Sequence, residues 1–324
     1  MGESPVSVSE ALRSAVRQLR ESGSRSPRLD AELLLATALG VERTELLRAS
    51  ERELTFVEQR RFRDYVERRA AHEPVAYIRR RRAFRTLELE VSPAVLIPRP
   101  ETETLVDVAL EVLAGVPVRA GTGAYEPVAL DVGTGSGCVA LALAAENPYV
   151  RVVAVDVDPG AAEMARRNAA RLGLGARVDV VTGDLLGDLG AERRFDVIVS
   201  NPPYVPAAEY ETLEPNVHDF EPRLALYGGE DGLDVYRRLI PAAATALEPH
   251  GVLALEVGAG QAAAVSDLLA ASGRFAPAAV RADLAGTPRV VFAPLAPAAI
   301  ARPSPAPDMA PPSGPASPAG GDGR

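Results

Sequence analysis

The sequence predicts an α/β protein in which a doubly wound, Rossmann-like sheet follows a small helical N-terminal region. From about residue 127 onward, short apolar runs alternate with helical segments, which is the pattern of a mostly parallel sheet with helices on both faces. A glycine-rich turn follows the first apolar run, at the place where such sheets bind ligands. Residues 1–75 show only helical apolar spacing.

The expected elements of the sheet follow from this alternation. Strands are predicted at 128–132, 150–157, 178–181, 195–200 and 251–257, and helices at 139–146, 160–172, 233–247 and 260–272. Two further strands, at 278–282 and 289–292, are close enough in sequence to pair antiparallel.

The chain is expected to divide into four parts. Residues 1–80 form a helical domain, with helices near 9–19, 31–41 and 56–66 and a helix end at Gly40. Residues 81–100 form a β-hairpin linker, because residues 87–91 alternate in polarity before a break at Ser92-Pro93. The α/β domain occupies 101–293 and starts with a helix near 102–114, and the Pro/Ala-rich tail at 294–324 is expected to be disordered.

Composition excludes several classes of function. Through Arg82 the chain has 17 Arg against 13 acids, and the remainder has 18 Arg against 31 acids, so the α/β part is acidic and disfavours non-specific binding to nucleic acid. One cysteine, Cys138, and three separated histidines argue against a disulfide or a metal site. No apolar run of 18 residues and no signal-peptide pattern is present, which predicts a cytoplasmic protein without a membrane span.

The glycine-rich turn reads Asp131-Val132-Gly133-Thr134-Gly135-Ser136-Gly137. Glycines let the backbone turn sharply and approach a ligand closely. A dinucleotide motif requires G-x-G-x-x-G, but Gly137 comes one position early and Cys138, expected to be a packing residue, takes the last glycine's place. A phosphate-binding loop requires a Lys, and the sequence has none.

Acidic residues follow the next two strands. Asp156 ends the second strand, where an α/β sheet presents a carboxylate to ribose hydroxyls. Asp158 precedes Pro159 and is the better candidate for a helix cap. Asp184 and Leu185 follow the third strand and are expected to line an adenine pocket. Together with the glycine loop, these positions favour S-adenosylmethionine as the cofactor.

The fourth strand runs directly into Asn201-Pro202-Pro203-Tyr204. The Asn201 side-chain carbonyl and the Pro202 backbone carbonyl could each accept one N–H of a planar NH₂ group, while Tyr204 offers a flat face to it. Such a site favours methyl transfer to an amide or amino nitrogen by positioning and electrostatics. An ordinary turn after a strand is the simpler alternative, and the glycine loop and Asp156 disfavour it.

The sequence resembles the peptide-chain-release-factor N5-glutamine methyltransferases over residues 8–293. The resemblance is carried by ordered motifs: Asp30 to Leu34, His72 to Ile78, Leu96 to Glu103, Asp131 to Gly137, Asn201 to Tyr204, Glu221 to Leu226 and Gly228 to Asp234. The family commonly has a Gly shortly after the Tyr77-Ile78 pair, where this chain has the run Arg79 to Arg82, and an aromatic residue where this chain has Leu185.

The resemblance implies a seven-stranded methyltransferase domain, with the helical domain recognising the substrate. It implies methyl transfer to the glutamine of the Gly-Gly-Gln loop of class I release factors, without stable nucleic-acid binding. By carry-over, the cofactor-binding residues are Gly133, Thr134, Gly135, Ser136, Gly137, Asp156, Asp184, Leu185 and Asn201. The substrate-binding residues are Asn201, Pro202, Pro203 and Tyr204, of which Asn201, Pro202 and Tyr204 are expected to be catalytic.

Three alternatives stay open at this point. An adenine-N6 nucleic-acid methyltransferase shares the tetrapeptide, but the acidic α/β part disfavours it. A methyltransferase acting on a glutamine of a ribosomal protein shares both the tetrapeptide and the glycine loop. A cofactor-binding module without catalysis would not need the intact Asn201 to Tyr204 set.

Overall fold

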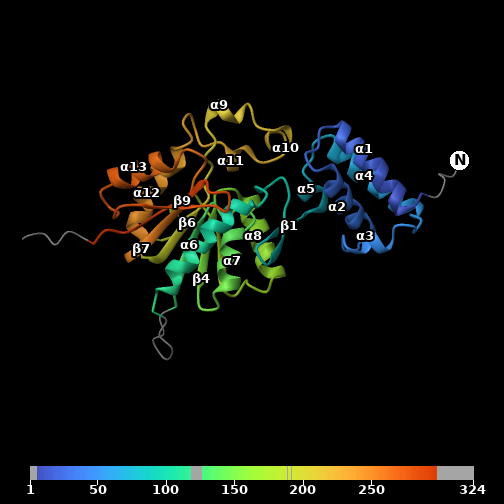
Figure 1. Ribbon diagram of the computed structural model, residues 1–324. Helices are drawn as coiled ribbons and strands as arrows, with labels where there is room; N and C mark the ends of the chain where they lie inside the picture. The colour runs from blue at the N-terminus through green and yellow to red at the C-terminus, as the bar shows by residue number, and fades with distance from the viewer. Residues whose placement is uncertain (1–5, 118–125, 188, 191, 298–324) are drawn as a thin grey trace, which may run out of the picture.

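The computed structural model describes residues 6–117, 126–187, 189–190 and 192–297. A bundle of N-terminal helices lies at one end of the molecule and the α/β body at the other, with a short hairpin between them (Figure 1). Most of the predicted disordered tail, from residue 298 onward, lies outside the described residues.

The N-terminal helices form around their own apolar core. They are α1 (Val8–Glu21), α2 (Pro27–Leu39), α3 (Glu45–Arg48), α4 (Phe56–Ala70) and α5 (Val75–Arg79). Capping boxes on Ser7 and Thr55 start α1 and α4, and Gly40 ends α2 with φ 68°, as predicted. Fully buried Leu19, Leu34 and Leu35 pack at the centre of the bundle.

One buried ion pair joins two of these helices. The Asp30 carboxylate accepts a hydrogen bond of 2.8 Å from Arg69 Nε, and it also accepts bonds from the Ser24 and Ser26 hydroxyls at 2.8 and 2.9 Å. The Asp30 and Arg69 side chains are only 8% and 14% exposed. The stability of such a buried ion pair depends on both charges, because either one alone would be buried without compensation.

The hairpin occupies the first ten residues of the predicted linker. Strands β1 (Arg81–Phe84) and β2 (Leu87–Glu90) pair antiparallel around a turn at Arg85 and Thr86, while residues 91–97 form no strand. The alternation in β2 was recognisable, but its partner strand is part of the arginine run. Arg81 stays exposed there and forms an ion pair with Glu88 across the hairpin.

The arginine run also explains the missing family glycine. Arg80 caps α5 in the left-handed conformation, with φ 57°, and its backbone N–H bonds to the carbonyls of Ala76 and Tyr77. Glycine adopts this conformation without the steric cost that a Cβ imposes. The arginine therefore takes the backbone geometry that a glycine would otherwise fill.

The sheet has seven strands, which confirms the predicted α/β architecture. They are β3 (Val128–Val132), β4 (Arg151–Asp156), β5 (Val178–Thr182), β6 (Phe195–Ser200), β7 (Leu247–Glu256), β8 (Ala279–Ala282) and β9 (Pro288–Pro294), in the order β5-β4-β3-β6-β7-β9-β8. The first five strands run parallel, and β9 pairs antiparallel with both β7 and β8, as the short connection between β8 and β9 predicts.

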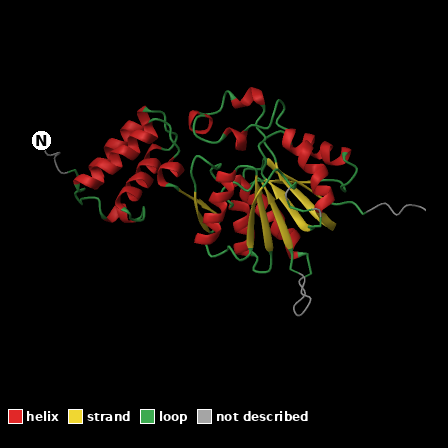
Figure 2. Cartoon of the chain, turned by 180° about the vertical axis from the view of Figure 1, so that it is seen from behind, coloured by secondary structure: helices red, strands yellow, loops and turns green. Residues whose placement is uncertain are grey.

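Helices cover both faces of the sheet (Figure 2). Helices α6 (Glu103–Ala114), α7 (Cys138–Glu146) and α8 (Pro159–Arg171) pack on one face, and α12 (Asp234–Ala246) and α13 (Ala262–Ala271) pack on the other. Neighbouring strand residues divide between the two faces: Ala129 packs under α6 and α7, and Leu130 packs under α12. Both faces are apolar, as expected for parallel strands covered on both sides.

Among the described residues after the hairpin, four short helices were not predicted. They are η1 (Pro100–Thr102), α9 (Ala207–Tyr210), α10 (Pro215–His218) and α11 (Arg223–Leu226). Helices of one turn show no apolar period, so the sequence pattern cannot indicate them. The last three lie between β6 and α12 in the chain and stand above the sheet, with α10 nearest the helical bundle (Figure 1). None of the described helices is long and apolar enough to cross a membrane.

Candidate active site

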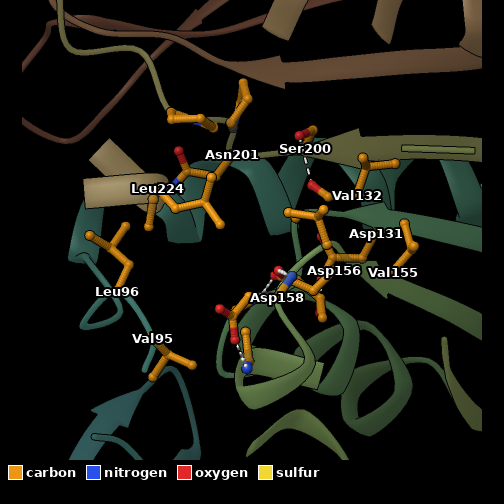
Figure 3. A pocket seen from close by; sticks show the side chains of 18 of the residues that line it. Val95, Leu96, Asp131, Val132, Val155, Asp156, Asp158, Ser200, Asn201 and Leu224 are labelled. Atoms are coloured by element: carbon orange, nitrogen blue, oxygen red, sulfur yellow. Dashed lines mark hydrogen bonds between the residues drawn. The ribbon is translucent and has the colours of Figure 1, made fainter. Parts of the chain in front are cut away.

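A cavity of about 200 Å³ opens where the carboxyl ends of β3, β4 and β6 meet (Figure 3). This is the position where open α/β sheets bind their ligands. The loops after these strands line it, together with residues 183–185 after β5, the linker residues 94–96, 98 and 99, and helix α11. The cavity therefore combines segments from four strand ends with the segment that precedes the sheet.

The glycine loop after β3 is shaped by three left-handed residues. Gly133, Gly135 and Gly137 have φ values of 73°, 56° and 83°. A Cβ on Gly133 or Gly135 would meet no atom within 4 Å, whereas one on Gly137 would lie 3.0 Å from Leu141 Cδ1. The first two glycines thus leave space beside the loop, and the third allows the loop to pack on its helix.

Asp131 holds the loop against the start of α7. Its Oδ2 accepts a bond of 2.7 Å from the Thr134 hydroxyl and one of 3.1 Å from the Ala140 backbone N–H. The side chain is fully buried, and this burial raises its pKa to about 6. The neighbouring Cys138 thiol lines the cavity, and burial raises its pKa to about 12, so it stays protonated and is no nucleophile.

Asp156 and Asp158 both line the cavity, and only Asp158 caps a helix. Asp156 lines the cavity, and its Oδ2 accepts a bond of 2.8 Å from the Gly135 N–H. Burial raises its pKa above the ordinary value. Asp158 caps α8 by accepting a bond of 2.9 Å from the Ala161 N–H. Asp156 therefore links β4 to the glycine loop and still faces the cavity.

The far end of the cavity is formed by the loop after β5. Asp184 and Leu185 both line it, and Leu185 has a left-handed φ of 53°. The Asp184 carboxylate forms an ion pair with Arg238 of α12, another lining residue that the sequence did not indicate. This pair joins the loop after β5 to α12 at the edge of the cavity.

Asn201 leaves the end of β6 and faces the cavity beside the apolar side chains of Leu96 and Leu224 (Figure 3). Its Nδ2 donates a hydrogen bond of 3.1 Å to the hydroxyl of Thr102, which is 1% exposed. The Ser200 hydroxyl donates to the Val132 carbonyl at 2.7 Å and so ties the ends of β6 and β3 together. With its NH₂ turned to Thr102, Asn201 leaves its carbonyl oxygen for another donor.

Tyr204 occupies a different position from the rest of the tetrapeptide. Pro202 and Pro203 line the cavity, but Tyr204 is not among the described residues that do so. Its ring packs in the core of the α12 face, close enough to Gly258 that a Cβ there would lie 3.0 Å from Tyr204 Cδ2. Its carbonyl accepts a bond from Gln261 Nε2 at 2.9 Å. The structure thus places Tyr204 behind the loop rather than at its open surface.

Most of the predicted site residues meet at this one cavity. Its lining includes Gly133, Thr134, Gly135, Ser136, Asp156, Asp184, Leu185, Asn201, Pro202 and Pro203, and among the described lining residues it lacks Gly137 and Tyr204. Gly137 instead caps α7. The lining has four aspartates, Asp131, Asp156, Asp158 and Asp184, against two arginines, Arg99 and Arg238, and this excess of carboxylates suits a cationic ligand.

The linker contributes to the cavity in a way that sequence reasoning missed. Arg99 lines it and forms an ion pair with Glu221, whose side chain is 1% exposed and whose second oxygen accepts the Ile97 N–H at 3.2 Å. Both residues belong to recognisable motifs, but nothing in their spacing of more than 100 positions indicates the contact. The pair fastens the linker to the segment that precedes α11.

A buried amide anchors the hairpin to the same loop. Asn168 of α8 is fully buried; its Oδ1 accepts the Glu90 N–H at 2.8 Å, and its Nδ2 donates to the carbonyls of Glu90 and Ser136 at 3.0 and 2.9 Å. The sequence offered no signal for this residue. It joins the last residue of β2 to the glycine loop.

Comparisons with known proteins match both the helical bundle and the α/β part of the chain. The model described as the PrmC N-terminal domain matches residues 10–79, and the one described as the methyltransferase small domain matches residues 106–217. A release factor glutamine methyltransferase of Moorella thermoacetica is 44% identical over 288 residues, which are 89% of this chain and 98% of that protein. A protein of the same name from Koribacter versatilis is 44% identical over 286 residues, which are 88% of this chain and 98% of that protein.

The chain belongs to the release factor glutamine methyltransferases. Because nearly the whole length of these relatives is matched, the family likeness includes the helical bundle as well as the sheet. A solved structure of a release-factor-specific protein-(glutamine-N5) methyltransferase from Alicyclobacillus acidocaldarius is 31% identical, with a TM-score of 0.40, and the match covers 64% of this methyltransferase and all of that chain.

Proposed function

We propose that this methyltransferase transfers a methyl group from S-adenosylmethionine to the side-chain amide nitrogen of the glutamine in the Gly-Gly-Gln motif of class I release factors. The observation that carries the proposal is the orientation of Asn201, whose NH₂ bonds to Thr102 while its side chain lines the cavity. The carbonyl oxygen is thereby available to accept an N–H from a substrate amide. The release factors' place at the ribosome makes the cytoplasm the expected location.

The cavity fits the proposed cofactor in shape and charge. Gly133 and Gly135 leave open space along one side, so a ligand can approach the backbone directly. Asp156 provides a carboxylate with lone pairs to spare for ribose hydroxyls, and Asp184 and Leu185 lie at the adenine end of the proposed site. When bound, S-adenosylmethionine supplies an electrophilic methyl group on a positively charged sulfur, which suits the carboxylate-rich lining.

The substrate amide is the poorer reactant, because its nitrogen lone pair is delocalised. We infer that the Asn201 Oδ1 and the Pro202 carbonyl accept its two N–H groups and hold the nitrogen toward the methyl group. As the new N–C bond would form and the S–C bond of S-adenosylmethionine break, positive charge would develop on the nitrogen and the two carbonyl dipoles would stabilise it. The nitrogen would then lose one of its two protons to solvent, and S-adenosylhomocysteine would leave. Pro202 and Pro203 have fixed φ angles, so little chain entropy is lost in keeping these carbonyls in place.

Apolar side chains complete the substrate end of the cavity. Leu96 from the linker and Leu224 from α11 both line it, and Leu224 is 57% exposed in the absence of a substrate. These side chains would contact the aliphatic part of a glutamine and exclude water from the reacting nitrogen. Tyr204 lies behind Asn201, so we propose that it supports the loop instead of stacking on the substrate.

A transfer assay tests this function. The purified protein is incubated with radiolabelled S-adenosylmethionine and a release factor, a matched release factor with its Gly-Gly-Gln glutamine changed to Asn, a ribosomal protein preparation, or duplex DNA. We expect label only in the unchanged release factor. Equal labelling of the Asn variant would refute the substrate site, and preferential labelling of a ribosomal protein or of DNA would assign the activity to that substrate.

Asn201 is tested separately from cofactor binding. Because it is assigned to the substrate amide, Asn201→Ala should lower kcat by roughly 100-fold or more and leave cofactor affinity within about threefold of the wild type. A parallel collapse of cofactor affinity, measured by calorimetric titration, would show that Asn201 serves the cofactor instead.

A further inference from the structure

We propose that Glu256 and Thr102 act as a positioning pair that fixes the amide of Asn201 with its carbonyl oxygen toward the substrate. The inference rests on the proposed function, since it explains how the substrate-accepting group acquires its orientation. Neither partner was indicated by the sequence: Thr102 ends η1, and Glu256 ends β7, next to β6 in the sheet.

The contacts form a chain of three side chains. Asn201 Nδ2 donates to the Thr102 hydroxyl at 3.1 Å, and the Thr102 hydroxyl in turn hydrogen-bonds with the Glu256 carboxyl group. Thr102 and Glu256 are each 1% exposed, so water does not compete for these bonds. Only Asn201 and Thr102 line the cavity, which makes Glu256 a residue that acts through its neighbours.

The number of protons available to the three hydrogen-bonded side chains determines the orientation of the Asn201 amide. A threonine hydroxyl has one proton and two lone pairs. When Glu256 is ionised, it has no proton to give, so the hydroxyl proton must point to the carboxylate. Only lone pairs then face Asn201, which must present its NH₂ to Thr102 and its carbonyl oxygen to the cavity. The reverse orientation would place an NH₂ against the NH₂ of the substrate.

The location of Glu256 is otherwise difficult to explain. Its Oε2 is buried and has no hydrogen-bond partner among the described residues, and a carboxylate left this dry costs free energy. Its backbone carbonyl accepts a bond of 2.7 Å from the Tyr236 hydroxyl, but that contact needs no acidic side chain. A glutamine of similar shape would pack as well, so the charge requires a purpose beyond packing.

The charged state of Glu256 is sensitive to pH near neutrality. Burial raises its pKa to about 7, and the Thr102 hydroxyl and nearby Arg289 act in the opposite direction. The other titratable or charged groups around it are Arg99, Glu101, Cys138, Tyr204 and Tyr236. A protonated Glu256 can itself donate a hydrogen bond to the Thr102 hydroxyl. The hydroxyl proton is then free to turn toward Asn201, and the orientation of the Asn201 amide is no longer fixed.

Three variants test the pair against a purely structural role. Glu256→Gln and Thr102→Val keep the shape but lose, respectively, the obligatory acceptor and the hydroxyl, and Thr102→Ser keeps the hydroxyl. We expect kcat on a release factor to fall by roughly 10- to 100-fold in the first two, the usual effect of losing an orienting partner. Thr102→Ser should stay near the wild type, and all three should keep KM for the cofactor within about threefold.

The pH profile of kcat provides the second readout. The wild type should lose kcat on an acid limb with its midpoint near pH 7, and Glu256→Gln should lack this limb. A Glu256→Gln enzyme with wild-type kcat, or with the acid limb unchanged, would overturn the positioning pair while leaving the proposed function intact. If Thr102→Val and Thr102→Ser lose activity equally, the hydroxyl is not the connecting group and the inference is also refuted. A wild type that does not methylate the release-factor glutamine would instead refute the proposed function.

Discussion

Replacing Gly137 by alanine tests how closely the glycine loop packs on the sheet's helices. Gly137 caps α7 with φ 83°, a conformation that costs an L-residue roughly 1–2 kcal/mol. The added Cβ would also lie 3.0 Å from Leu141 Cδ1 and 3.3 Å from Ala165 Cβ of α8. Overpacking of this kind typically costs about 1–3 kcal/mol.

The two contributions together give a loss of roughly 2–5 kcal/mol in the free energy of unfolding. At about 2 °C per kcal/mol for a chain of this size, the melting temperature should fall by roughly 4–10 °C. Gly135→Ala is the matched control. Gly135 has φ 56° but no atom within 4 Å of the added Cβ, so only the backbone cost of roughly 1–2 kcal/mol applies.

The two variants should also differ in cofactor binding. The methyl group of Gly135→Ala would stand beside the cavity, so this variant should bind S-adenosylmethionine much more weakly while melting only a few degrees lower. Thermal unfolding followed by circular dichroism and calorimetric titration of the cofactor measure both properties. If Gly137→Ala melted no lower than Gly135→Ala, the close packing of the loop against α7 and α8 would contribute nothing to stability, and the reasoning would be wrong.

Further predictions concern other parts of the chain. Asp30→Asn should destabilise the N-terminal helices by about 3 kcal/mol, because it leaves Arg69 buried without a charge partner. Hydrogen exchange in α2 and α4 during chemical denaturation measures this loss, and an unchanged stability of the two helices would contradict it. Asp158→Ala should cost about 1 kcal/mol through loss of the α8 cap, and a Ser at the same position should restore most of it. Arg80→Gly should raise the free energy of unfolding by about 1 kcal/mol, because glycine adopts the left-handed backbone conformation without the steric cost of a Cβ. A lower melting temperature would contradict this. The raised pKa of Glu256, about 7 against 4.5, means that its contribution to stability is present below pH 4.5 and is lost as the pH rises through 7. Between pH 4.5 and 8, the free energy of unfolding of Glu256→Gln should therefore fall by roughly 3 kcal/mol less than that of the wild type. Parallel curves of this free energy against pH would refute the prediction.

The strands were predictable because their ends carry strong signals. β3 and β6 have the bounds that the sequence predicts, since each apolar run stops at residues that break a strand, Gly133 after β3 and Asn201-Pro202 after β6. The parallel order also follows from the alternation of strands and helices. The first strand of the hairpin gave no signal of its own, because it begins with two arginines, Arg81 and Arg82, and a run of charges is not typical of a strand.

The site was predictable only where its residues stand at or directly after the end of a strand. The glycine loop, Asp156 and Asn201 each follow a strand, so their convergence could be inferred from topology. Thr102 contacts Asn201, and Glu256 contacts Thr102. These two residues are 99 and 55 positions away from Asn201 in the chain, and the sequence pattern contains no information on such contacts. Tyr204 was misjudged for another reason: its place in the tetrapeptide favoured a role at the surface of the cavity, but its ring packs against the core.

The linker between the bundle and the sheet has a consequence for how this enzyme can be divided. Residues 94–96, 98, 99 and Thr102 line the cavity, and Glu221 holds Arg99 in place. A shortened protein that began at α6 would contain every strand of the sheet and the entire glycine loop, yet it would lack one side of the cavity and the hydroxyl that Asn201 contacts. The smallest active unit must therefore start upstream of the sheet, and any exchange of N-terminal regions between relatives has to make its junction before Ala94.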